Sequence, residues 1–154
     1  MNIHFKSETS EWATPKDFFD KLNDEFHFTL DPCATDSNKK VNRFFTKKDN
    51  GLEKSWESEI VFMNPPYGRE IGRWVEKAYL ESKRGALVIC LIPSRTDTKW
   101  WHNYVMRSSE IRFVRGRIKF GLSKNSAPFP SAVIIFGKRP FNKSFKPTVK
   151  STAA

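Results

Sequence analysis

The 154-residue sequence has few residues of the kinds that bind metals or form disulfides. It contains two cysteines, Cys33 and Cys90, and three histidines, His4, His27 and His102. None of them has the spacing of zinc ligands, so we expect no metal site. Both cysteines lie in or beside apolar segments. This favours buried, reduced thiols in a cytoplasmic protein over a disulfide framework.

Long apolar runs are also missing. No segment approaches the roughly 20 apolar residues that a membrane-spanning helix needs, and residues 1–6 lack the apolar centre of a signal peptide. We therefore predict no membrane segment. Internal repeats are absent, and a chain of this length is large enough for one domain with its own core. We predict a single domain over residues 1–137 and a basic, flexible tail over 138–154.

Acidic residues are fewer than basic ones. The chain has 27 Lys and Arg against 17 Asp and Glu, a formal net charge of +10. Such a surface attracts polyanions. No long amphipathic basic helix accompanies the charge, so nucleic acid is a better-matched partner than a membrane. A basic surface that serves only solubility is the alternative.

Hydrophobic periodicity predicts alternating strands and helices. The expected strands cover 26–30, 41–46, 60–63, 86–93, 110–114 and 131–136. The expected helices cover 15–25, 69–83 and 97–107. This order favours an α/β fold with a mostly parallel sheet, helices on both faces and an antiparallel final strand pair.

The most informative segment follows the expected strand at 60–63. There Asn64, Pro65, Pro66 and Tyr67 form a stiff turn, because each proline fixes φ at about −65° and removes an N–H donor. Open α/β sheets bind ligands at the carboxyl ends of their strands. The turn suits a planar amine such as adenine N6: Asn64 Oδ1 and the Pro65 carbonyl each accept one hydrogen, while Tyr67 stacks on the ring. A surface turn with two prolines is the alternative.

Two carboxylates follow expected strands at the same edge. Asp31 begins the turn Asp-Pro-Cys-Ala and can hold the amino group or ribose of a nucleotide-like cofactor. Asp49 can accept from a ribose hydroxyl or an adenine amine. Ordinary turn chemistry accounts for each of them equally well. Cys33 has no histidine near it in a recognisable pattern, so we do not predict a catalytic thiol.

Aromatic residues near these turns can bind flat ligands. Trp12, Thr14 and Pro15 precede the first expected helix and can cover one end of a cofactor, although a tryptophan packed on the core is the alternative. Phe129 and Tyr67 offer two faces that can sandwich a base extruded from a duplex. Phe129 can equally serve as an anchor for its own loop.

Taken in order, these segments resemble the small phage-type DNA N6-adenine methyltransferases, a Dam-like family. The resemblance spans about residues 12–136. It rests on Trp12-x-Thr14-Pro15, Asp31-Pro32-Cys33-Ala34, Asp49-x-Gly51-Leu52 with Trp56, Asn64-Pro65-Pro66-Tyr67, Leu91-Ile92-Pro93 with Trp100, Gly116-Arg117-Ile118-Lys119-Phe120 and Pro128-Phe129-x-Ser131. Asn-Pro-Pro-Tyr alone is shared with methyltransferases that act on RNA adenine or on glutamine in release factors, so the ordered set is more specific.

The resemblance implies a Rossmann-like methyltransferase fold, S-adenosylmethionine as cofactor, and adenine N6 in duplex DNA as the substrate, reached by base flipping. It implies a catalytic motif of Asn64, Pro65, Pro66 and Tyr67. The cofactor-binding residues it implies are Trp12, Thr14, Pro15, Asp31, Cys33 and Asp49. The substrate-binding residues it implies are Tyr67 and Phe129. The basic cluster at 112–119 adds Arg115, Arg117 and Lys119 as candidates for phosphate contacts, and Arg115 or Arg117 could instead read guanine in the major groove. Protection of a phage genome from restriction, in the host cytoplasm, is the purpose it suggests.

Two features depart from larger methyltransferases. No glycine-rich loop follows Asp31, and only one expected strand, 41–46, lies between Asp31 and the strand that leads into Asn64, so we expect a sheet that is trimmed at one edge. Two alternatives stay open. One is a methyltransferase of the same fold that acts on RNA adenine or a protein glutamine. The other is an inactive nucleic-acid-binding module, which predicts no binding of S-adenosylmethionine.

Overall fold

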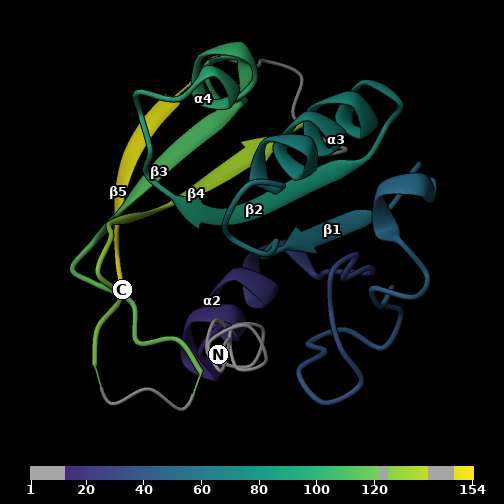
Figure 1. Cartoon of the computed structure of the whole chain (residues 1–154), viewed down its shortest axis with the longest axis horizontal. Helices are drawn as coiled ribbons and strands as arrows, with labels where there is room; N and C mark the ends of the chain where they lie inside the picture. The colour runs from purple at the N-terminus through teal and green to yellow at the C-terminus, as the bar shows by residue number, and fades with distance from the viewer. Residues whose placement is uncertain (1–12, 122–124, 139–147) are drawn as a thin grey trace, which may run out of the picture.

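The computed structural model describes residues 13–121, 125–138 and 148–154. A five-stranded sheet with the order β1-β2-β4-β3-β5 runs through its middle. The strands are β1 (Ile60–Met63), β2 (Leu87–Pro93), β3 (Glu110–Arg115), β4 (Ser131–Phe136) and β5 (Thr148–Ala153). Helix α2 (Lys16–Phe26) covers one face, and α3 (Ile71–Lys83) and α4 (Lys99–Asn103) cover the other (Figure 1). Short 3₁₀ helices, η2 (Gly51–Glu53) and η3 (Val105–Arg107), lie in the connections.

Four of the five strands point in the same direction. The pairs β1–β2 and β3–β5 are parallel, and β4 runs antiparallel to both of its neighbours, β2 and β3. The predicted α/β class, with a mostly parallel sheet and an antiparallel β3–β4 pair, is confirmed. The carboxyl ends of β1, β2 and β3 therefore meet at one edge of the sheet, and β4 starts there.

The pleat of β2 separates two hydrophobic layers. Its even-numbered side chains, from Val88 to Ile92, pack with the apolar face of α3. Its odd-numbered side chains, from Leu87 to Leu91, pack with the apolar face of α2. Every position of β2 is buried, as expected for a strand that is covered on both faces.

Beyond β1 the sheet continues only as isolated bridges. Leu30 pairs with Val61, and Asp31 pairs with Phe44. The segments 26–30 and 41–46 thus lie along this edge, but the prediction that they form regular strands is wrong. One reason is that His27 ends α2 in a left-handed conformation, with φ of 57°. Another is that the residue after Asp31 is a proline, which has no N–H to extend the pairing.

The helix predicted over 97–107 is divided in the structure. Helix α4 begins after Thr98, whose hydroxyl accepts a hydrogen bond from the Trp101 N–H, and it ends at Asn103. Tyr104 leaves helical geometry, with φ of −124°, and η3 follows. None of the described helices has the length and apolar character that crossing a bilayer requires.

The largest difference from the prediction concerns the tail over 138–154. Residues Thr148–Ala153 form β5, which pairs in parallel with all of β3. The Thr148 hydroxyl donates to Glu110 at 3.2 Å, and Lys150 Nζ lies 3.1 Å from the same carboxylate oxygen. The strand is almost wholly exposed, so its sequence has no apolar face from which pairing could be predicted. Residues 139–147 of the predicted tail lie outside the described residues.

Candidate active site

The turn at Asn64 lies at the carboxyl edge of the sheet, directly after β1. Val61, Phe62 and Met63 are buried and fix the start of the turn. Asn64 is half-buried and Pro65 is buried. The amide of Asn64 and the carbonyl of Pro65 are therefore held by the core rather than by a loose surface loop.

Two hydroxyl groups contact the Asn64 amide. Nδ2 donates to Thr14 Oγ1 at 3.0 Å, and Oδ1 accepts from the Tyr67 hydroxyl at 2.9 Å. The Tyr67 hydroxyl also lies 3.4 Å from the carbonyl oxygen of Leu91 on β2. Burial raises the pKa of Tyr67, so its hydroxyl stays protonated and serves as a donor. Thr14, predicted as a cofactor residue, is buried against this amide.

Three aromatic rings meet at Tyr67. The Phe129 ring centroid lies 5.4 Å from that of Tyr67 at an interplanar angle of 82°, and the Phe120 centroid lies 6.0 Å away at 86°. This edge-to-face arrangement is one that aromatic quadrupoles favour. Tyr67 and Phe129 thus come together as predicted. The two rings are perpendicular in this structure, so they present one face and one edge to a flat base. That they sandwich an extruded base stays a prediction.

Asp31 and Cys33 lie beside the same turn. Asp31 is buried, and its Oδ1 accepts from the Cys33 N–H at 3.3 Å. Burial raises the pKa of Asp31 to about 6, and the N–H groups of Cys33 and Lys40 and the charge of Lys40 oppose this rise. Burial likewise raises the pKa of the Cys33 thiol, which lies against the backbone N–H of Asn64. Cys33 is therefore a neutral thiol in the wall of the site.

Asp49 is exposed and closes its own turn. Its Oδ2 accepts from the N–H and the hydroxyl of Thr46, at 2.9 Å and 3.0 Å, and these bonds lower the pKa of the carboxyl. The turn packs on the Asp31 segment, since a Cβ on Gly51 would lie 2.1 Å from the Pro32 carbonyl oxygen. The structure thus brings the Asp49 loop against the Asp31 turn, while Thr46 occupies one oxygen of the carboxylate.

The other predicted residues are divided between two regions. Pro15 precedes α2 and accepts from the Phe19 N–H, and Trp12 lies outside the described residues. Arg115, Arg117 and Lys119 are exposed at or after the carboxyl end of β3, on the same sheet edge as Asn64. Arg117 Nη1 donates to the Ala127 carbonyl at 3.4 Å.

Two exposed arginines at this edge were missed by the sequence reasoning. Arg69 follows the turn after β1, and Arg95 follows the end of β2. Because each follows a strand of a parallel sheet, its position in the sequence is enough to predict that it lies at this edge. Together with Arg115 and Arg117, they place positive charge along the sheet edge that carries the Asn64 turn.

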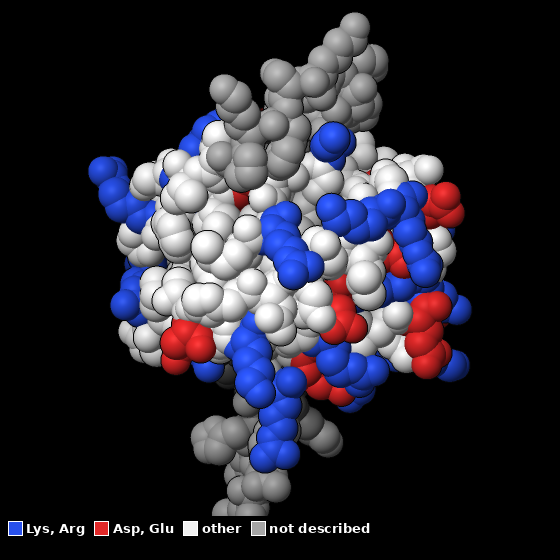
Figure 2. All heavy atoms as spheres, turned by 90° about the horizontal axis from the view of Figure 1, so that it is seen from above, with Lys and Arg blue, Asp and Glu red and all other residues white. Residues whose placement is uncertain are grey.

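The face that carries α3 and α4 has a different charge pattern. Seen from this side, Lys and Arg are interspersed with Asp and Glu (Figure 2). Some exposed charges pair with each other, as in Arg73–Glu70 at the start of α3. Such a face lacks the single-sign surface that attracts a polyanion.

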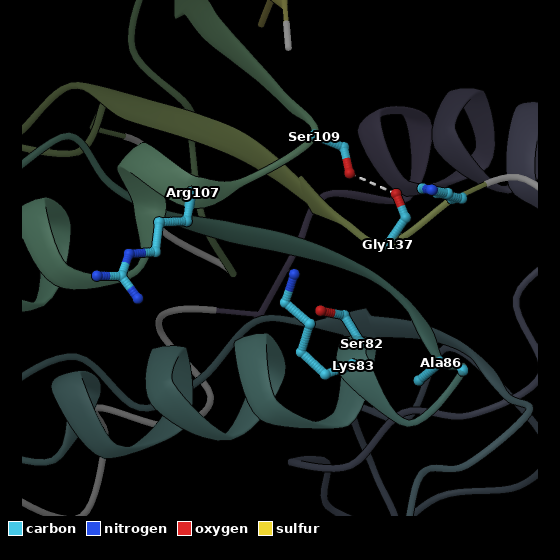
Figure 3. Close-up of a pocket in the computed structure, with 8 residues that line it drawn as sticks. Ser82, Lys83, Ala86, Arg107, Ser109 and Gly137 are labelled. Atoms are coloured by element: carbon cyan, nitrogen blue, oxygen red, sulfur yellow. Dashed lines mark hydrogen bonds between the residues drawn. The ribbon is translucent and has the colours of Figure 1, made fainter. Parts of the chain in front are cut away.

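A cavity of about 420 Å³ lies at the opposite edge of the sheet, with Lys83, Arg107 and Lys138 in its lining. Lys83 projects into it from the end of α3, and the Ser109 hydroxyl donates across its rim to the Gly137 carbonyl (Figure 3). None of the sequence-predicted site residues lines this cavity. Among the described residues, no three His, Cys, Asp or Glu side chains form a group that could hold a metal.

Comparisons with known proteins find a family that matches most of the chain. The family model for "DNA N-6-adenine-methyltransferase (Dam)" matches residues 3–152. The DNA N-6-adenine-methyltransferase of Haemophilus phage HP1 (strain HP1c1) is 33% identical over 121 residues, which cover 75% of this chain and 68% of that protein. The protein of the same name from Escherichia phage T1 is 25% identical over 116 residues. That match covers 74% of this chain and 48% of the T1 protein, so the chain spans about half of its length.

Among solved structures, one similar chain is described as a class I S-adenosylmethionine-dependent methyltransferase from Listeria monocytogenes. Its TM-score is 0.46 at 9% sequence identity, over 73% of this chain and 42% of that one.

Proposed function

The chain belongs to the DNA N-6-adenine-methyltransferase (Dam) family, and we propose that it transfers a methyl group from S-adenosylmethionine to the N6 amine of adenine in duplex DNA. The observation that carries this proposal is the Asn64 amide at the carboxyl edge of the sheet, held at both ends and bordered by Tyr67 and Phe129.

The residues around Asp31 fit a cationic cofactor. Burial raises the pKa of Asp31 to about 6, so the N–H groups and the Lys40 charge around it do not fully offset the cost of burying its negative charge. A positively charged ligand supplies the missing compensation, and S-adenosylmethionine carries an ammonium and a sulfonium group whose methyl is transferred. Asp31, Pro15, Cys33 and Asp49 are the described residues that we propose to hold it, and Trp12 is the remaining candidate. Thr14, also predicted to bind the cofactor, lies beside them, but its hydroxyl contacts the Asn64 amide.

The target adenine must leave the duplex to reach Asn64. Extrusion costs a few kcal/mol of stacking and pairing. The face of one ring and the edge of the other, from Tyr67 and Phe129, offset part of this cost by contacting the extruded base.

At the amine, Asn64 Oδ1 and the Pro65 carbonyl each accept one hydrogen. Both bonds together favour a tetrahedral nitrogen whose lone pair points at the methyl carbon. Bound S-adenosylmethionine would supply the methyl group: the new N–C bond would replace its S–C bond, and the amine proton would leave to solvent. Because that proton becomes acidic only on methylation, no strong general base is needed. Catalysis is therefore mostly positioning and electrostatic complementarity.

The basic residues at this edge give the duplex a place to bind. We propose phosphate contacts for Arg115, Arg117 and Lys119, and Arg69 and Arg95, which follow β1 and β2 at the same edge, are further candidates. Both named relatives come from phages. A phage-encoded enzyme would act in the host cytoplasm, where methylation can protect the phage genome from restriction.

Methyl-labelled S-adenosylmethionine tests the substrate class directly. The protein is incubated with unmethylated duplex DNA, RNA and a protein extract, and each is digested to identify the modified unit. We expect labelled N6-methyladenine from DNA alone. Label in RNA adenine or in glutamine would point to the related methyltransferases. Absence of label together with absence of cofactor binding would point to an inactive binding module.

A further inference from the structure

We propose that Thr14 is a positioning residue that fixes the orientation of the Asn64 amide, rather than a residue that acts chiefly on the cofactor. This inference rests on the proposed function, because it concerns which end of the amide meets the adenine amine. It is drawn from the contact between Thr14 Oγ1 and Asn64 Nδ2, at 3.0 Å.

The two ends of a primary amide have nearly the same shape but opposite hydrogen-bonding character. The oxygen only accepts, and the NH₂ only donates. The substrate amine offers hydrogens, so Asn64 must present Oδ1 to it. A reversed amide would set donor against donor and leave the amine without one of its two acceptors. The shape of the side chain does not choose between these states, so its neighbours must.

The Tyr67 hydroxyl identifies which end is the oxygen. Its 2.9 Å contact with Asn64 lies within the normal O–H···O range, whereas its 3.4 Å contact with the Leu91 carbonyl lies outside it. The phenolic proton therefore points to Asn64, and the atom that receives it is Oδ1. The other end, Nδ2, then faces Thr14, whose hydroxyl oxygen accepts. Because a hydroxyl can also donate, Thr14 holds the amide in the orientation that the Tyr67 proton sets.

This arrangement leaves Oδ1 able to serve the substrate. An amide oxygen has two lone pairs, so Tyr67 can occupy one and the adenine amine the other. Donation from Nδ2 to Thr14 also draws electron density toward Oδ1, which strengthens it as an acceptor. Thr14 is 4% exposed, so water cannot readily replace its hydroxyl as the partner of Nδ2.

Isosteric substitution separates this role from a role in cofactor binding. In Thr14→Val the shape is kept and the hydroxyl is lost. We expect kcat for adenine methylation to fall about 10-fold to 100-fold, the scale of a misplaced catalytic group, with the Kd for S-adenosylmethionine within about 2-fold of wild type. Thr14→Ser should recover most of the rate. The matched control is Thr148→Val on the exposed strand β5, which should leave the rate unchanged.

Hydrogen exchange of the Asn64 side-chain NH₂, followed by NMR, tests the contact without requiring turnover. We expect slow exchange in wild type and Thr14→Ser, and fast exchange in Thr14→Val with the backbone amides of β1 still protected. Equal exchange in all three proteins, or a Thr14→Val variant that loses cofactor affinity while keeping kcat, would overturn the inference. A wild type that makes no N6-methyladenine would instead refute the proposed function.

Discussion

Asp31 is the buried carboxyl of the site, and its burial gives the protein a pH dependence with a definite sign. Its pKa lies at about 6 in the folded protein against an ordinary value of 3.8. The folded state therefore binds this proton more tightly than the unfolded state does. The contribution of protonated Asp31 to the free energy of unfolding is fully present below about pH 4. It is lost as the pH rises through about 6, which lowers the free energy of unfolding by about 3 kcal/mol at neutral pH.

Cofactor binding should depend on pH in the opposite direction. A cationic ligand needs the charged carboxylate, so lowering the pH from 8 to 5 should weaken binding of S-adenosylmethionine about 10-fold, as most of Asp31 becomes protonated. Isothermal titration calorimetry at a series of pH values measures this. Asp31→Asn is the control, and it should bind weakly at every pH. A wild type whose Kd is constant across this range would exclude Asp31 as the partner of the cation.

Single residues also show what sequence reasoning could reach at the site. The Asn64–Tyr67 turn was predictable because proline chemistry acts on adjacent residues. The contact between Thr14 and Asn64 was not, since it joins two distant segments through a hydroxyl that has no periodic pattern. The perpendicular setting of Tyr67 and Phe129 depends on how two loops pack, which no local sequence feature reports.

Among the helices and strands, the sequence predicts those whose hydrophobic pattern matches their burial in the structure. Strand β2 is buried at every position and reads as a continuous apolar run. Helix α3 places Ile71, Trp74, Val75 and Ala78 on its buried face, at helical spacing. The segments at the two edges of the sheet also pair through backbone hydrogen bonds, but the pattern of their side chains does not predict this pairing. The sequence therefore predicts regular strands beside β1, where the structure has only isolated bridges, and it does not predict β5.

Strand β5 is expected to stabilise the domain despite its exposure. It pairs with every residue of β3, and Glu110 on β3 contacts both Thr148 and Lys150. A chain that ends at Lys138 should expose the backbone of β3 and unfold at a melting temperature lower by on the order of 5–10 °C, equivalent to about 1–2 kcal/mol. Differential scanning calorimetry of both chains measures the shift. An unchanged melting temperature would favour the flexible tail that the sequence predicts.

At the scale of the whole molecule, the parallel strands bring the predicted chemistry to one edge of the sheet. The Asn64 turn, the Asp31 turn and the loop after β3 all lie there, whereas the cavity with Lys83 and Arg107 lies at the other edge. The net charge of +10 is a property of the entire chain. The contribution of each basic residue to DNA binding should nevertheless depend on which edge of the sheet that residue occupies.

Salt dependence distinguishes the two edges. The logarithm of the DNA-binding constant should fall linearly with the logarithm of the salt concentration, with a slope of about 0.9 for each phosphate contacted. Single changes of Arg115, Arg117 or Lys119 to Gln should each reduce that slope by about 1. Lys83→Gln, which removes a positive charge at the opposite edge, should leave it unchanged. Equal slopes for all four variants and wild type, measured by fluorescence anisotropy, would contradict this placement of the duplex.

The most direct test of the account is the yield of N6-methyladenine in duplex DNA from wild type and Asn64→Ala, measured by mass spectrometry of digested DNA under single-turnover conditions. We expect wild type to form the modified base. We expect Asn64→Ala to lose most of this activity, by about 100-fold or more, with the same thermal stability and cofactor affinity. Equal rates for a folded Asn64→Ala variant and wild type would contradict the claim that this amide holds the adenine amine.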